Sequence, residues 1–148
     1  MCSVRWMMGV LIAIGLALSG CQKEEVAPKY HPATLAESGQ PGIMRVTLDA
    51  RAAERIGLET TAIREEPVTL AGGTARRNVV PYGALLYDKK GDTWTFTNPQ
   101  PLAFVRAHVV VERIEGDRVI LAEGPPAGTL VVTVGATELL GVEHKYAH

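Results

Sequence analysis

The chain has 148 residues, a formal net charge of −1 and a mean hydropathy of +0.09. The length fits one domain with a short extension and excludes a large multidomain enzyme. The near-zero charge excludes the electrostatic footprint of a general nucleic-acid binder, and a hydrophobic content of 47% excludes a disordered polyelectrolyte. Aromatic residues make up only 5%, so we expect a core of mainly Val, Leu, Ile and Ala.

Residues 1–20 have the features of an export signal. Arg5 supplies a positive charge, and residues 7–18 form an apolar run of 12 residues, whereas a membrane-spanning helix needs about 20. The run ends at Leu18, and Ser19 and Gly20 then precede Cys21, which resembles the bacterial lipobox. That resemblance implies a thioether-linked diacylglycerol on Cys21, which becomes the mature N-terminus. The alternative is an uncleaved signal anchor in which Cys21 has no role.

The cysteine count agrees with this interpretation. Cys2 lies in the part to be removed, so Cys21 is left as a lipidated residue, and no disulfide or cysteine-based metal site is expected. Two or more acyl chains give stable anchoring. We therefore expect a lipid-anchored protein of the cell envelope, on the extracytoplasmic (periplasmic) side of a membrane, with no cofactor other than the covalent lipid.

Residues 21–42 are predicted to form a flexible tether, because charged residues and repeated Pro and Gly leave no apolar period. Order is expected over residues 43–142. Residues 43–48 alternate as a strand, and Asp49 is a candidate N-cap for a short helix through Ile56, with Gly57 at its C′ position. A second strand is expected over residues 58–64; Pro67 interrupts it, and residues 68–70 could continue it. Residues 71–78 are expected to be a polar junction.

The remaining elements, from residue 79 onward, are predicted to be mostly strands. Residues 79–81 and 84–87 have β character, residues 89–92 are a hairpin turn, and Trp94 and Phe96 then share one face of the next strand. Residues 104–114 form the longest strand candidate, with Arg106, His108 and Glu112 on a face expected to be exposed to solvent. Strands over residues 118–122 and 130–134, one helical turn over residues 135–140 and a polar tail over residues 143–148 complete the chain.

This pattern predicts a mainly β fold: a small β-barrel or β-roll of six or seven short strands with one or two short helices. No nucleotide-binding, nucleophile-elbow or zincin motif occurs in the sequence, and we expect a protein that is not an enzyme. Asp88 and Asp92 flank a turn, where aspartates are ordinary. His144 and His148 have the i, i+4 spacing of two metal ligands on one helical face, and the adjacent Glu143 could add an oxygen ligand. The stretch is short and terminal, so a solvated tail is the favoured interpretation.

Two stretches resemble the membrane-proximal domain of periplasmic adaptor subunits, the HlyD-like membrane fusion proteins of RND-type efflux systems. The main one runs from VVPYGALLYD at residues 79–88 and GDTWTF at residues 91–96, through Phe104, Gly116 and Gly124, to Leu140. The other, residues 46–60, resembles the segment by which adaptors enter the same domain, so residues 43–70 are interpreted as an entry segment. The resemblance implies a small β-roll that docks on a transporter.

This chain departs from the adaptors at residues 71–78, which replace the lipoyl-like sandwich, helical hairpin and further β-barrel of a full adaptor. The resulting hypothesis is a truncated, non-catalytic accessory of an RND-type inner-membrane transporter. Its candidate partner-binding residues are Arg106, His108, Glu112 and Arg118. The alternatives are a stand-alone lipoprotein that binds a metal or small ligand, and a degenerate adaptor remnant.

Overall fold

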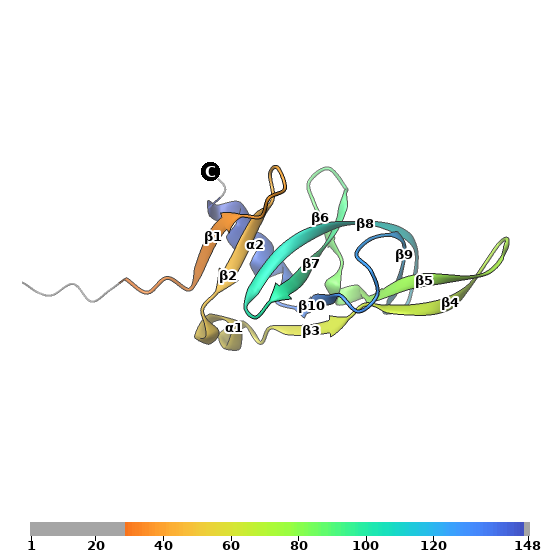
Figure 1. Ribbon diagram of the computed structural model, residues 1–148, viewed down its shortest axis with the longest axis horizontal. Helices are drawn as coiled ribbons and strands as arrows, with labels where there is room; N and C mark the ends of the chain where they lie inside the picture. Colours follow the sequence, from red (N-terminus) through yellow and green to blue (C-terminus); the bar gives the residue numbers. More distant parts are fainter. Residues whose placement is uncertain (1–28, 147–148) are drawn as a thin grey trace, which may run out of the picture.

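The computed structural model describes residues 29–146, which form ten β-strands, two α-helices and one 3₁₀ turn (Figure 1). The mainly β fold is as predicted, but there are ten strands where six or seven were expected. The strands are β1 (Ala33–Glu37), β2 (Met44–Leu48), β3 (Glu59–Ala62), β4 (Arg64–Leu70), β5 (Gly73–Pro81), β6 (Leu86–Tyr87), β7 (Thr93–Gln100), β8 (Ala103–Glu115), β9 (Arg118–Glu123) and β10 (Leu130–Val134). The helices are α1 (Ala50–Ile56) and α2 (Ala136–Tyr146), and the 3₁₀ turn is η1 (Tyr82–Ala84).

The strands form one antiparallel sheet that curls into a half-barrel (Figure 1). Its order is β3-β10-β7-β8-β9-β5-β4, and β2 joins β8, β1 joins β2 and β6 joins β7 beside this path. The two ends of the order, β3 and β4, are consecutive in the chain with only Ile63 between them. The N–H of Ile63 donates to the Thr129 carbonyl at 2.9 Å, and its carbonyl accepts from the Gly128 N–H at 2.8 Å. The continuous segment formed by β3, Ile63 and β4 therefore supplies both edge strands of this order.

Helix α1 has the boundaries that the sequence predicts. The Asp49 side chain accepts a hydrogen bond from the Arg51 N–H at 2.9 Å, which satisfies one of the backbone donors that a helix start leaves unpaired. Gly57 ends the helix in the left-handed conformation, with φ of 63°. This conformation costs glycine little, and its N–H caps the last carbonyls.

Strand β1 corrects the prediction that the tether extends to residue 42. Ala33–Glu37 pairs antiparallel with β2, from Ala33 opposite Leu48 to Glu37 opposite Met44. Gly39 and Gly42, which suggested a linker, have positive φ and lie in the turn between the two strands. Leu35 packs against the core. A short stretch of alternating apolar and polar residues can therefore form a strand when a neighbouring strand pairs with it.

The β4–β5 hairpin gives the structure of residues 71–78, which were predicted as a polar junction: most of them belong to β5. The two strands pair without interruption from Arg64 opposite Val79 to Leu70 opposite Gly73, which leaves Ala71 and Gly72 as the turn. Pro67 lies inside β4 and does not end it, because β4 is an edge strand whose outer side has no ladder bond to lose. The hairpin projects away from β1, β2 and α2 (Figure 1).

Two apolar clusters cover the two faces of the central strands. One lies between the sheet and α2 and includes Val46, Phe96 and Phe104, each at most 1% exposed. The other fills the curl of the sheet and includes Val80, Val109 and Val131. The central residues of strands β7 and β10 are therefore buried on both faces of the sheet. Trp94 packs against the same cluster as Phe96, as the alternation predicts, and aliphatic side chains make up most of both clusters.

Helix α2 corrects the predictions for the C-terminal end. A single turn over residues 135–140 was expected, but the helix continues to Tyr146, so residues 143–146 are not a polar tail. It packs against β1 and β2 (Figure 1). Leu139 is fully buried, and Glu143, one helical turn later on the same face, is 1% exposed.

Candidate functional site

Arg106, predicted to face solvent as a partner-binding residue, is buried. It is 8% exposed and lies under α2, where its Nε is 2.8 Å from Oε2 of Glu143. The two groups form an ion pair without the alignment of a hydrogen bond. The prediction failed because alternation along β8 assigns Arg106 to the face opposite Val105 and Val109, and α2 covers part of that face.

Glu143 joins α2 to two strands at once. Its Oε1 accepts the backbone N–H of Met44 at 3.1 Å, while its Oε2 faces Arg106. The ladder between β2 and β8 includes Arg45 opposite Val105, and Met44 and Arg106 are the next residues along. The carboxylate therefore lies where this ladder ends. It provides the acceptor that the Met44 N–H needs in a buried place and the counter-charge for Arg106.

Trp94 on β7 brings two of the predicted residues together. The Arg106 guanidinium carbon lies 4.4 Å from the centre of the indole ring, a cation–π contact. His108, directly opposite Trp94 on β8, meets the ring edge-on, with centroids 5.1 Å apart and planes at 82°. His108 is exposed, so this side chain reaches solvent at the rim of the buried pair.

Asp88 fixes the turn between β6 and β7. Its Oδ1 accepts the backbone N–H groups of Lys90 and Asp92 at 2.8 and 3.0 Å, and its Oδ2 accepts the Trp94 indole N–H at 3.2 Å. Desolvation raises the pKa of Asp88, but the backbone hydrogen bonds and the indole outweigh it and lower the pKa below 3.8. Asp88 is therefore a structural carboxylate that stays ionised at neutral pH, which agrees with its interpretation as a turn residue.

Glu112 and Arg118 lie in a separate group of ion pairs near the β4–β5 hairpin. Glu112 pairs with Nε of Arg77 on β5 at 2.7 Å. Arg118 pairs with Glu66 on β4 at 2.6 Å and with Glu115 at 2.9 Å. The four predicted partner-binding residues thus divide into two places: Arg106 and His108 flank Trp94, while Glu112 and Arg118 form a polar surface of alternating charge.

The histidines of the predicted metal site are only partly described. His144 lies on α2 and is exposed, whereas His148 lies outside the described residues. Within residues 29–146, no three His, Cys, Asp or Glu side chains lie close enough to hold a metal ion. Cys21 and the export signal also lie outside the described residues.

Glu143 is the residue whose structural role sequence reasoning missed, because it was considered only as an oxygen ligand beside the two histidines. One signal was present: Glu143 is four residues after Leu139, and this spacing places a charged side chain on the apolar face of a helix. The prediction of one helical turn ended before Glu143 and hid this spacing. Neither described helix is long and apolar enough to cross a membrane. The sequence matches no protein-family model and no curated protein.

Proposed function

We propose that this protein is a lipid-anchored, non-catalytic accessory of an RND-type efflux transporter on the extracytoplasmic face of a membrane. The observation that supports the proposal most is the pairing of the two stretches that resemble adaptors. Strand β2 of the entry segment pairs with β8, β3 pairs with β10 and β4 pairs with β5. An entry segment that completes the sheet of the main part is what the resemblance implies.

The β4–β5 hairpin is a second support. A full adaptor carries its other domains between the entry segment and the main part. Here the chain crosses the same place with a turn of two residues, Ala71 and Gly72, between strands in continuous register. A domain closed in this way keeps a surface for docking without the parts that reach an outer-membrane channel.

The lipid anchor gives the mechanism. Between Cys21 and the start of β1 at Ala33, an extended chain spans at most about 40 Å. An anchored domain is thereby concentrated near the bilayer, and even a weak interface with a transporter becomes occupied. The polar surface around Glu112 and Arg118 carries charges of both signs, which favour specific docking over general attraction.

The test is cross-linking in cells. A photo-reactive residue replaces Arg118, at the polar surface, or Thr34, an exposed control on β1. We expect the Arg118 position, and not the Thr34 position, to capture a large polytopic transporter, identified by mass spectrometry. Cys21→Ala removes the anchor and is expected to reduce the capture. A folded, membrane-bound protein that captures no transporter at either position would contradict the proposal.

A further inference from the structure

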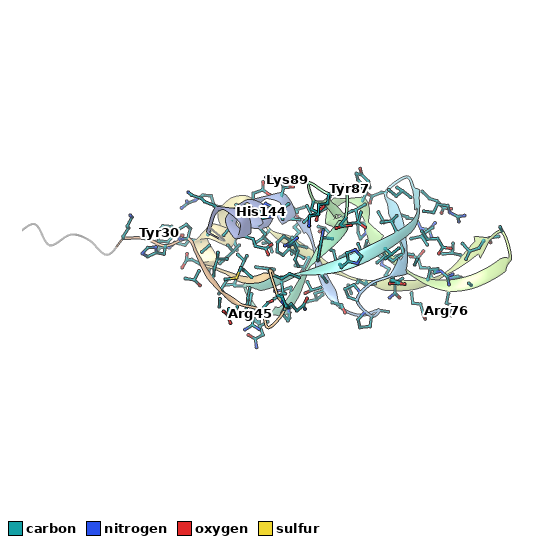
Figure 2. All side chains as sticks on the ribbon, turned by 90° about the horizontal axis from the view of Figure 1, so that it is seen from above. Tyr30, Arg45, Arg76, Tyr87, Lys89 and His144 are labelled. Carbon is teal, nitrogen blue, oxygen red and sulfur yellow. The ribbon has the colours of Figure 1, made fainter. Side chains whose placement is uncertain are left out.

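An open cavity with a mainly cationic lining lies beside the β6–β7 turn. Its volume is about 660 Å³, which includes open solvent, and three elements meet around it. Lys89 and Lys90 come from the turn, Arg106 from β8 and His144 from α2, and Asp88 completes the lining. Figure 2 shows Lys89 and His144 next to each other, although they are 55 positions apart in the sequence.

The acidic residue that lines this cavity, Asp88, and the one behind Arg106, Glu143, are committed to other partners. Both oxygens of Asp88 accept hydrogen bonds from its own turn and from Trp94. Both oxygens of Glu143, behind Arg106, face the Met44 N–H and the Arg106 Nε. Among the described residues, the side chains of Lys89, Lys90 and His144 have no ion-pair partner.

The backbone of the turn and the Arg106 guanidinium are also held in place before any ligand arrives. Asp88 fixes the turn that carries the two lysines, and Arg106 is held between Glu143 and the Trp94 ring. Ordering side chains is a large part of the free-energy cost of binding, and a group that is already ordered adds little to this cost. Hydrogen-bond donors from three elements suit an anion with more acceptor oxygens than the two of a carboxylate.

We propose that this cavity, lined by Lys89, Lys90, Arg106 and His144, binds a phosphate group. The group has two sources near a membrane: the headgroup of an anionic phospholipid, or a free phosphate. A headgroup would give the anchored domain a second contact with the bilayer and would set its orientation there. The proposal does not depend on the transporter, because the cavity exists whether or not a partner is bound.

The test uses the mature chain, residues 21–148, with Cys21→Ala, so that neither an attached lipid nor the apolar export signal inserts into vesicles. Inorganic phosphate is titrated at constant ionic strength while NMR shifts of Lys89, Lys90 and His144 are followed. In a second arm, sedimentation with phosphatidylglycerol vesicles is compared with phosphatidylcholine vesicles. Lys89→Gln with Lys90→Gln is expected to weaken binding at least tenfold, the loss expected for one charge-assisted contact.

The matched control is Arg51→Gln with Arg55→Gln on α1, which removes the same charge from exposed positions away from the cavity. We expect this control to bind within twofold of the parent. Circular dichroism verifies the fold of each variant, and His144→Gln is a second variant at the site. Saturable binding in either arm that only the site variants weaken supports the proposal and identifies the source. No binding in both arms, or equal loss in the control, overturns it.

Discussion

Replacing Glu143 with Gln tests whether the contact of α2 with β2 and β8 stabilises the fold. The substitution keeps the size of the side chain and an acceptor for the Met44 N–H, but it leaves the Arg106 charge buried without a carboxylate. Removing one partner of a buried ion pair costs about 3–5 kcal/mol. A domain of this size has about 5–15 kcal/mol of stability in total, so we expect a loss of about a fifth or more.

The loss can be expressed as a melting temperature. Unfolding entropy is about 2.1 cal/mol/K per residue, so the roughly 120 described residues give about 0.25 kcal/mol/K. A loss of 3–5 kcal/mol then lowers the Tm by about 12–20 °C. Thermal and urea unfolding of the full chain carrying Cys21→Ala, followed by circular dichroism, measures this shift.

Two further variants make the experiment specific. Arg76→Gln breaks the exposed Arg76–Glu65 pair, whose side chains are 64% and 45% exposed, and is expected to cost less than about 1 kcal/mol. Arg106→Met with Glu143→Leu removes both buried charges and is expected to be more stable than Glu143→Gln, although the Met44 N–H then loses its acceptor. Equal shifts for Glu143→Gln and Arg76→Gln would refute the reasoning.

Three other predictions concern the turn, a close backbone approach and the core. Because the folded-state pKa of Asp88 lies below 3.8, its stabilisation is present above that pH and disappears as the pH falls through the folded-state value; Asp88→Asn should flatten the acid side of the stability curve, and a carboxyl NMR titration measures the pKa directly. Gly83→Ala should lower the free energy of unfolding by about 1–3 kcal/mol, because a Cβ there would lie 2.7 Å from the Thr133 carbonyl oxygen. Gly141→Ala, in open space on α2, should raise the free energy of unfolding by up to about 1 kcal/mol. Urea unfolding of the two variants measures both changes, and changes of the same sign would contradict this prediction. Phe96→Ala should cost about 3–5 kcal/mol in the same assay, since Phe96 is fully buried between the sheet and α2.

The sequence predicts those elements that are determined by residues close to them in the chain. The Asp49 cap, the Gly57 terminus and the β6–β7 turn each depend on neighbouring residues, and the structure has them where they were expected. Strand β1 and the N-terminal half of β5 are different, because their strand character comes from the partner strands β2 and β4 and not from their own composition. Pairing between distant segments overrides local propensity in such cases.

The candidate site illustrates the same limit. Alternation along β8 gives the two faces of the strand, but it does not say which element lies on each face. Arg106 is buried because α2 covers it, and the length of α2 was underestimated. His108, two residues later, lies beyond this cover and is exposed as predicted. A charged residue on a strand can therefore be assigned to solvent only after the packing of helices is known.

The contact between Met44 and Glu143 also bears on how the chain reaches its native state. It joins positions 99 residues apart, so the second strand and the last helix meet only when nearly the whole chain is present. Folds dominated by such distant pairings form slowly, in milliseconds to seconds. The export that we propose for this chain would fit such a delay, because β2 lacks its contacts with α2 until the C-terminal residues arrive.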